Sequence, residues 1–287
     1  MKILVLGATG MLGHKLLQGL SPGHEVWGTV RGQTAQAPEI PGFDRVNLIG
    51  EVSAANLGSI RQALEAVTPD VVLNCIGIVK QIDAAKDAIT SITINALLPH
   101  QLAELCVQTG GARLIHFSTD CVFSGRSGPY RESDQPDATD LYGRSKLLGE
   151  VDRPGCLTIR TSIVGRELRR GTGLIDWFVS QRGRQVRGYR QALYTGLTTQ
   201  AMADVVRMIL AFHTGLSGVW QVSADPIDKC SLLDLVNEVY GLDIRIVPDE
   251  TFHCDRRLDS SHFRTITGWN PSTWQAMVEA MHADPLL

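Results

Sequence analysis

The chain of 287 residues lacks several features that would assign it to particular classes of protein. No apolar run approaches the roughly 20 residues that a membrane-spanning helix needs, so we expect no membrane segment. The formal net charge is −3, and without a basic excess we expect no nucleic-acid partner. Internal repeats and low-complexity segments are also absent, which argues against a repeat architecture.

The six cysteines show no CxxC spacing, and no set of His, Cys, Asp and Glu has the spacing of a metal site. We therefore predict no metal, and scattered cysteines favour reduced thiols in a cytoplasmic protein. The segment Met1–Leu6 runs directly into glycine-rich sequence, which predicts a strand rather than a signal peptide.

What the first half does contain is an alternation of strand and helix patterns, which predicts an α/β fold with a Rossmann-type, doubly wound parallel sheet. The expected strands are Ile3–Leu6, Glu25–Val30, Asp70–Cys75, Leu114–Phe117 and Cys156–Arg160, with a weaker one near Arg45–Leu48. The expected helices are Met11–Leu20, Leu57–Val67, Ala84–Thr109 and Asp140–Glu150, the third of them bent near Pro99.

Three glycines, Gly7, Gly10 and Gly13, lie between the first expected strand and the first expected helix. Glycine permits a tight turn and the close approach of backbone to a pyrophosphate, and the helix directs its free N–H groups at the anion. Such a triplet alone is a weak signal. Its place between an N-terminal strand and an amphipathic helix favours a dinucleotide site over an ordinary turn.

The end of the second expected strand distinguishes the two nicotinamide dinucleotides. A carboxylate there would bind the ribose 2′-hydroxyl of NAD, but Arg31 stands there instead, and no Asp or Glu follows it until Glu39. A guanidinium suits the 2′-phosphate of NADP, although a solvated arginine would look the same in sequence. We therefore expect NADPH as the cofactor, with NADH as the alternative.

Beyond Ser162 the alternation loosens, which predicts a smaller C-terminal substrate lobe. Helical patterns remain at Thr198–Phe212 and Leu232–Tyr240, and a strand pattern remains at Gly218–Val222. The expected division is residues 1–161 for the NADP-binding Rossmann domain, joined by a segment near 196–222, and residues 162–195 and 223–287 for the substrate-binding lobe.

Tyr142 and Lys146 lie four residues apart in an expected helix and therefore share a face. A phenol has a pKa of about 10, and a neighbouring ammonium stabilises the phenolate, so the pair is typical of a proton donor. A surface pair is the alternative.

Ser118-Thr119-Asp120 follows the strand Leu114–Phe117, where a hydroxyl can bind a substrate carbonyl. Alone, this tripeptide is more often a turn, and His116 reads as a packed core histidine.

Four stretches carry a family resemblance: Gly7–Gly13, Phe117–Phe123, Asp140–Lys146 and Ile159–Ser162. Together they resemble the extended short-chain dehydrogenase/reductases, and within these the dTDP-4-dehydrorhamnose reductase branch. The resemblance implies a catalytic triad of Thr119, Tyr142 and Lys146. The cofactor contacts that the motifs and the resemblance imply are Gly7, Thr9, Gly10, Met11, Leu12, Gly13, Arg31, Cys75, Ile76, Gly77, Tyr142, Lys146 and Thr161.

The chain departs from that branch at Cys121, where an aromatic is usual, at Ile163, where tryptophan is usual, and in the loop from Cys75 to Gln81. Related nucleotide-sugar 4,6-dehydratases place a glutamate base at the position of Cys121. A thiol with a pKa of about 8.5 is a poor substitute, so we expect carbonyl reduction rather than dehydration.

These observations predict an NADPH-dependent reductase of a 4-keto-6-deoxy nucleotide sugar, serving cell-surface polysaccharide. Hydride would go to the sugar ketone, with Tyr142 as proton donor, Lys146 as its activator and ribose ligand, and Thr119 on the carbonyl. The expected substrate contacts are Lys80, Thr119, Val122, Phe123, Ile163, Arg187 and Tyr194. The last two belong to a stretch with Tyr189 and Arg190 that reads equally well as an exposed basic loop.

Two other functions stay open at this stage. One is a nucleotide-sugar epimerase of the same superfamily, which would hold its cofactor tightly and consume no net NADPH. The other is a non-catalytic NADP-binding regulatory subunit, like the β subunit of methionine adenosyltransferase, which resembles this branch. A homodimer is a further expectation that the sequence does not decide.

Overall fold

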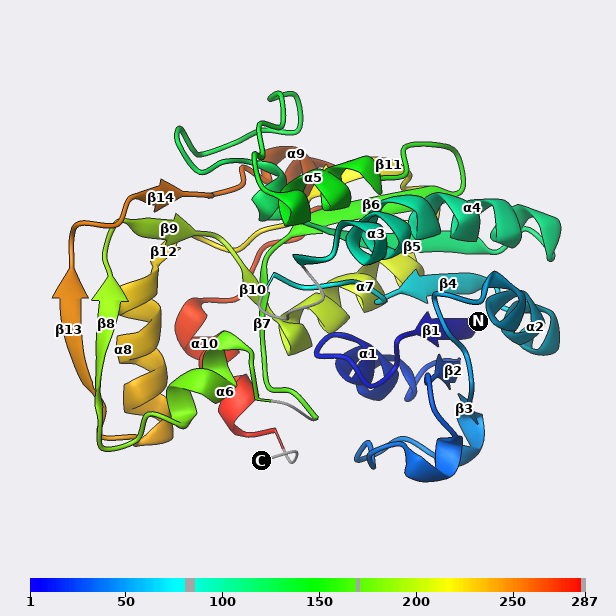
Figure 1. Cartoon of the computed structure of the whole chain (residues 1–287), viewed down its shortest axis with the longest axis horizontal. Coiled ribbons are helices and arrows are strands. Elements are labelled where there is room, and N and C mark those ends of the chain that lie inside the picture. The colour runs from blue at the N-terminus through cyan, green and yellow to red at the C-terminus, as the bar shows by residue number, and fades with distance from the viewer. Residues whose placement is uncertain (81–85, 169–170, 285–287) are drawn as a thin grey trace. The chain divides into compact units, whose positions relative to one another are not determined.

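The computed structural model describes residues 1–80, 86–168 and 171–284, and contacts within the chain divide it into two compact units (Figure 1). Unit 1 comprises Met1–Ser118, Thr139–Ile159 and Ala203–Val219. Unit 2 comprises Thr119–Ala138, Arg160–Met202 and Trp220–Leu287. No helix in the described ranges is long and apolar enough to cross a bilayer.

Unit 1 is built on a seven-stranded sheet with the order β11-β6-β5-β4-β1-β2-β3 (Figure 1). Strand pairs β1–β2, β1–β4, β2–β3 and β4–β5 are parallel. The run from β3 to β6 has the order of a doubly wound Rossmann sheet, which confirms the predicted fold class. The strands are β1 Lys2–Leu6, β2 Glu25–Thr29, β3 Leu48–Ile49, β4 Val71–Asn74, β5 Arg113–Thr119, β6 Cys156–Thr161 and β11 Gly218–Gln221.

The central strands read as apolar runs because both faces of the sheet are covered. All residues of β4 are buried, and Ile3 to Leu6 of β1 have no exposed surface. One face packs Leu4 and Leu6 into a core with residues of α2 (Leu57–Val67) and α4 (Leu98–Gln108). Fully burying one such aliphatic side chain stabilises the fold by about 1.5–3 kcal/mol.

Helices α1 (Gly13–Leu20) and α7 (Thr199–Phe212) meet through small residues and one hydrogen bond. A Cβ atom at Gly19 would lie 3.0 Å from the Cβ of Ala203, and Arg207 Nη1 donates to the Gly19 carbonyl at 3.3 Å. The helix predicted at Thr198–Phe212 is confirmed and begins one residue later than expected, at Thr199.

The long helix predicted at Ala84–Thr109 is interrupted. Residues 84–85 lie outside the described part, after which α3 (Ala88–Ser91) passes into a π-helix, η4 (Ile92–Leu97), before α4 begins. Pro99 lies in the first turn of α4, where its missing N–H is not needed, so the wide turn precedes the proline instead of being caused by it. The carbonyl of Asn95 in the π-helix meets Gly149, where a Cβ atom would overlap it.

The strand expected near Arg45–Leu48 is mostly a 3-10 turn, η2 (Arg45–Asn47), followed by the two-residue edge strand β3. Another 3-10 turn, η1 (Thr34–Gln36), lies in the predicted loop. Helix α5 (Leu141–Leu148) begins after Asp140, whose Oδ1 accepts from the Gly143 N–H at 2.8 Å. This side-chain cap fixes where the helix begins.

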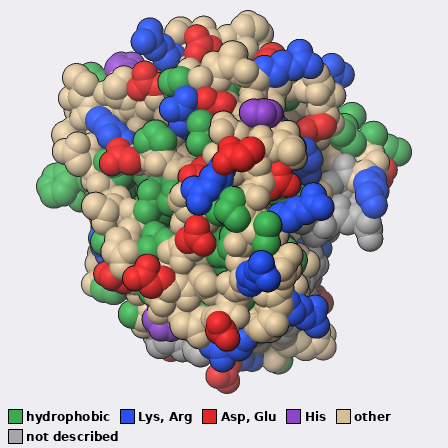
Figure 2. Space-filling view, turned by 90° about the vertical axis from the view of Figure 1, so that its left-hand side faces the viewer, with side chains coloured by type: hydrophobic (Ala, Val, Ile, Leu, Met, Phe, Trp, Pro, Cys, Tyr) green, Lys and Arg blue, Asp and Glu red, His purple; other side chains and the backbone are tan. Residues whose placement is uncertain are grey.

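Unit 2 contains small sheets, β7–β10, β8–β13 and β12-β9-β14, with helices α6, α8, α9 and α10 (Figure 1). Its strands are β7 Ile163–Val164, β8 Gln185–Tyr189, β9 Ala192–Tyr194, β10 Leu197–Thr198, β12 Ile227–Asp228, β13 Arg245–Asp249 and β14 Cys254–Asp255. Its helices are η5 Asp120–Val122, α6 Leu174–Val179, α8 Lys229–Tyr240, α9 Ser261–Thr267 and α10 Trp274–His282. Figure 2 shows a face on which Lys and Arg are interspersed with Asp and Glu rather than gathered by sign.

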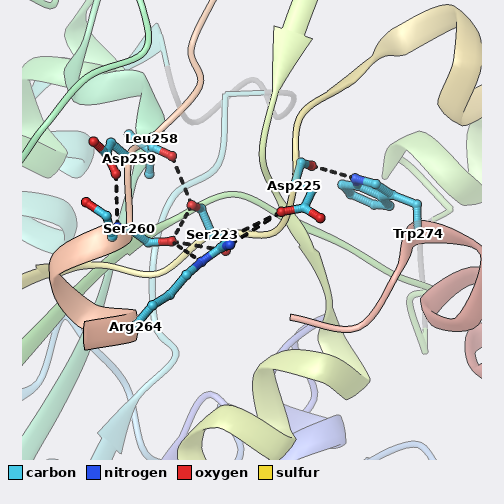
Figure 3. A network of polar contacts seen from close by, with 8 residues as sticks. Ser223, Asp225, Leu258, Asp259, Ser260, Arg264 and Trp274 are labelled. Carbon is cyan, nitrogen blue, oxygen red and sulfur yellow. Dashed lines mark hydrogen bonds and ion pairs between the residues drawn. The ribbon is translucent and has the colours of Figure 1, made fainter. Parts of the chain in front are cut away.

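A polar network fixes the segment after β11 within unit 2 (Figure 3). Ser223 Oγ donates to the Leu258 carbonyl at 2.9 Å, and Arg264 Nη2 donates to the Ser223 carbonyl at 3.0 Å. Trp274 Nε1 donates to the Asp225 carbonyl at 2.8 Å. These bonds connect residues 223–225 to α9 and α10 and satisfy backbone groups that burial would otherwise leave unpaired.

Candidate active site

The glycine loop of unit 1 has the geometry of a phosphate cradle. Gly7 has a φ of 80° and donates its N–H to Thr29 Oγ1 at 3.2 Å. The Gly10 N–H bonds back to the Gly7 carbonyl at 3.0 Å, and a Cβ atom at Gly13 would overlap that carbonyl oxygen. Glycine is therefore required at positions 7 and 13 for the turn to close.

Helix α1 leaves this loop without a side-chain cap, because Leu12 occupies the N-cap position. Backbone N–H groups of an uncapped first turn are available to an anion, and the helix dipole favours one there. Thr9 and Met11 are half-buried and Gly10 is exposed, whereas Leu12 packs into the core. The cradle therefore suits a dinucleotide pyrophosphate.

The loop after β4 lies against the same cradle. The Cys75 N–H extends the β1 ladder to the Leu6 carbonyl at 3.0 Å, and a Cβ atom at Gly7 would lie 3.2 Å from the Cys75 carbonyl group. Ile76 is half-buried and Gly77 is exposed. Arg31 is exposed two residues after β2. The structure thus brings Cys75 and Ile76 of the predicted loop to the glycine turn.

Helix α5 carries Tyr142 and, one turn later, Lys146. Tyr142 is half-buried, whereas Lys146 is only 6% exposed. Lys146 Nζ donates to the Phe117 carbonyl of β5 at 2.6 Å. Burial lowers the Lys146 pKa to about 8, against the opposing effect of Glu150 and Cys75. The amine is therefore still mostly charged at neutral pH.

His116 and Asn74 belong to this neighbourhood, although the sequence prediction gave them no role in it. His116 Nε2 lies 3.5 Å from Lys146 Nζ, and its Nδ1 lies 3.0 Å from Asn74 Nδ2. Burial lowers the His116 pKa well below its usual value, and Lys146 and His100 add to that effect. The ring is therefore neutral. The reading of His116 as a core histidine explains its burial but not its contact with Lys146.

Thr119, the last residue of β5, and the residues that follow it form a second group, within unit 2. Thr119 Oγ1 accepts from the Cys121 N–H at 3.1 Å and donates to Asp120 Oδ1 at 3.2 Å. Burial raises the Asp120 pKa, while Arg256 and Lys229 oppose that rise. Lys229 Nζ also lies 4.4 Å from the centre of the Tyr194 ring. The hydroxyl predicted to bind a carbonyl is thus supported by a buried carboxylate.

Residues 1–184 match the family model of the RmlD substrate binding domain. The chain belongs to this family. That membership confirms the resemblance to dTDP-4-dehydrorhamnose reductases that the four sequence stretches carry.

Two curated relatives show how far the RmlD similarity extends. The chain is 30% identical over 225 residues to a dTDP-4-dehydrorhamnose reductase of Mycolicibacterium smegmatis, covering 71% of this chain and 60% of that protein. It is 30% identical over 173 residues to methionine adenosyltransferase 2 subunit beta of Danio rerio, covering 59% of this chain and 50% of that protein. The chain thus matches half to three fifths of the length of these relatives.

The fold of this RmlD family member is also found in solved structures. The dTDP-4-dehydrorhamnose reductase of Bacillus anthracis, in complex with NADP, superimposes with a TM-score of 0.78. The superposition covers 98% of each chain at 19% sequence identity, so it shows the shared fold alone.

The residues predicted to bind substrate lie in different surroundings. Lys80 is exposed and bonds Asp140 Oδ2 at 2.9 Å, within unit 1. In unit 2, Val122 and Phe123 have no exposed surface, and Phe123 stacks on Tyr130 with ring centres 4.2 Å apart. The side chains of Val122 and Phe123 therefore pack in the hydrophobic core of unit 2. Gln81, part of the same predicted loop as Lys80, lies outside the described residues.

The basic stretch before Gly196 does not form one cluster. Arg187 is exposed on β8 and pairs with Asp249 Oδ2 at 3.5 Å, whereas Tyr194 on β9 is 3% exposed. Ile163 is half-buried on β7, and Thr161 is buried at the end of β6. Tyr194 is therefore placed beside Asp120 and Lys229, and Arg187 faces solvent.

A cavity of about 260 Å³ lies elsewhere in unit 2, beside the network of Figure 3. Ser223, Asp225, Ser260 and Arg264 are among the residues that line it. Arg264 is paired with Asp225, and none of the predicted substrate residues contributes to this cavity. The cavity therefore lends no support to the predicted substrate contacts.

Proposed function

We propose that the chain is an NADPH-dependent reductase of a 4-keto-6-deoxy nucleotide sugar. The observation that carries this proposal is the buried Lys146 amine, held on the Phe117 carbonyl one helical turn from Tyr142. Burying an ammonium opposes folding, and a lysine placed beside a tyrosine in an RmlD family member is best explained by chemistry at the phenol.

The glycine loop is the proposed cofactor site. The turn closed by Gly7 and Gly13, the uncapped start of α1 and the exposed Arg31 fit a pyrophosphate and a 2′-phosphate in kind and charge. A reduced nicotinamide bound there would supply the hydride. In this proposal unit 1 binds the cofactor and unit 2 supplies most of the contacts with the sugar nucleotide.

Three side chains carry the remaining chemistry. Tyr142 gives its phenolic proton to the ketone oxygen, and the Lys146 ammonium lowers the free energy of the phenolate left behind. Thr119 binds the carbonyl by turning its hydroxyl hydrogen from Asp120 towards the substrate. The substrate class comes from the reductase of Mycolicibacterium smegmatis, and the half-buried Ile163 is the proposed contact that would tune it.

A non-catalytic role is the second candidate, because the Danio rerio relative is a methionine adenosyltransferase subunit. Such a protein would bind NADP through the same loop and act through a partner protein. It would gain nothing from a charged amine beside a tyrosine, and the Lys146 environment therefore favours the reductase.

The test is NADPH oxidation, followed at the nicotinamide absorbance band, with a panel of 4-keto sugar nucleotides that includes dTDP-4-dehydrorhamnose. We expect turnover by the wild type and a loss on the order of 10²–10⁴ in Tyr142→Phe. Tyr189→Phe is the matched control, because that phenol is exposed on β8. Equal rates in Tyr142→Phe would remove Tyr142 from the mechanism. NADP binding without turnover on any keto sugar would support the subunit role.

A further inference from the structure

A row of three side chains crosses unit 1 from the central sheet to helix α5. Asn74 ends β4, His116 lies on β5 directly opposite it in register, and Lys146 projects from α5. Asn74 and His116 are each 1% exposed, so water does not mediate their contact. The proposed mechanism uses Lys146 but assigns nothing to the other two.

The hydrogen bonds of Asn74 determine which nitrogen of His116 carries the proton. The Ile76 N–H donates to Asn74 Oδ1 at 3.1 Å, which fixes the orientation of the amide. Asn74 Nδ2, which can only donate, therefore faces His116 Nδ1 at 3.0 Å. Nδ1 must accept, and the neutral ring carries its hydrogen on Nε2.

The Nε2–H group then faces Lys146 Nζ across 3.5 Å. An ammonium has three donors and no acceptor, so this contact sets a donor against a donor. A neutral amine has a lone pair that could accept from the same N–H. The Phe117 carbonyl, 2.6 Å from Nζ, is the acceptor that remains for the ammonium.

We propose that His116 is a positioning residue for Lys146: locked in the Nε2–H form by Asn74, it opposes the ammonium and directs its hydrogens to the Phe117 carbonyl and away from the imidazole. This inference rests on the proposed function for its catalytic meaning only. His116 thereby helps to set the pH at which Lys146 loses its charge and ceases to assist Tyr142.

Other groups act on the same amine and must be counted with His116. Glu150, two residues after the end of α5, favours the ammonium, and so does Cys75 in the loop after β4. His100 of α4 acts on His116 and helps to keep it neutral. Burial outweighs Glu150 and Cys75 and lowers the Lys146 pKa to about 8.

The first test needs no substitution. Nitrogen-15 NMR of the histidine ring in the ligand-free protein distinguishes a protonated ring nitrogen from a bare one. We expect His116 to show a protonated Nε2 and a bare Nδ1 from about pH 6 to about pH 9. A protonated Nδ1, or a doubly protonated ring within that range, would overturn the proposal.

The second test measures the Lys146 pKa by carbon-13 NMR of the lysine ε-carbons. His116→Phe keeps an aromatic ring of similar size but removes the opposing N–H, so the Lys146 pKa should rise by roughly half a unit or more. Asn74→Asp should raise it as well, because a carboxylate accepts from an Nδ1–H and turns Nε2 into an acceptor for Lys146. Ile115→Val, a buried change in the same strand, should leave it unchanged.

An unchanged or lower Lys146 pKa in His116→Phe would refute the inference. Because both NMR experiments use ligand-free protein, their outcome is independent of whether any keto sugar is reduced. If the enzyme turns over, the alkaline limb of kcat/KM in His116→Phe should move to higher pH by the same amount as the Lys146 pKa. An unmoved limb would overturn the catalytic role of His116 and leave the reductase assignment intact.

Discussion

Replacing Lys146 by methionine should stabilise the protein while it removes activity. The Lys146 amine is buried, and its pKa falls from 10.5 to about 8. At 1.36 kcal/mol per pH unit, that difference corresponds to roughly 3 kcal/mol of lost stability at pH 7. Methionine fills similar space without charge but forfeits the hydrogen bond to the Phe117 carbonyl, which is worth about 1–2 kcal/mol. The expected net gain is about 1–2 kcal/mol.

The sign of the pH dependence follows from the direction of the Lys146 shift. Because the folded-state pKa lies below the unfolded one, the penalty is complete below about pH 8 and disappears as the pH rises past 10.5. The advantage of Lys146→Met should therefore shrink by roughly 2 kcal/mol between pH 7 and about pH 9.5. Urea unfolding of both proteins at the two pH values measures this change.

Lys80→Met is the matched control, because the Lys80 side chain is 52% exposed. Its effect on the free energy of unfolding should stay within about 0.5 kcal/mol and should not change with pH. The reasoning fails if Lys146→Met is less stable than the wild type at pH 7. It also fails if the difference between the two proteins is the same at both pH values.

Three further outcomes can be checked directly. Gly13→Ala should lower the free energy of unfolding by about 1–3 kcal/mol and weaken NADPH binding at least tenfold, because the added methyl overlaps a backbone oxygen. Gly23→Ala, which meets nothing within 4 Å, should do neither, and equal effects would contradict the cradle geometry. Glu150→Gln should lower the Lys146 pKa below about 8 in a lysine NMR titration, since Glu150 favours the ammonium; a rise would contradict this. Arg264→Ala should lower the free energy of unfolding measured with urea by about 1–3 kcal/mol. An unchanged value would show that the polar network of Arg264 does not contribute to stability.

The sheet of unit 1 was predictable because its central strands are buried on both faces. A strand such as Val71–Asn74 reads as an unbroken apolar run, which is the pattern of a parallel sheet. The π-helix at Ile92–Leu97 could not be read, because an i→i+5 turn leaves no periodicity of its own in six residues. Two-residue strands such as β7 and β10 are too short to show alternation.

The site was predictable only where it is local in sequence. The Tyr142–Lys146 pair follows from the helical repeat, and the glycine turn follows from the spacing between a strand and a helix. Asn74 and His116 meet 42 residues apart through strand register, which no local pattern encodes. The sequence offered one indication, which is that two neighbouring apolar strands each contain a polar residue, Asn74 and His116, near the carboxyl end.

Lys146 in unit 1 and Asp120 in unit 2 are buried ionisable side chains whose charged forms burial destabilises. Burial lowers the pKa of Lys146 in unit 1 and raises that of Asp120 in unit 2, so it disfavours the charged form of both side chains. Asp120 has the compensation typical of a structural cluster, since Arg256 and Lys229 both favour its ionised form. Glu150 and Cys75 favour the Lys146 ammonium, but its hydrogen bond goes to a neutral carbonyl, and the imidazole of His116 lies 3.5 Å from the amine. A packing role would be served better by methionine, whereas stabilising the phenolate of a tyrosine proton donor requires a charged amine beside the phenol. The lysine, rather than the aspartate, is therefore the buried charge that chemistry must explain.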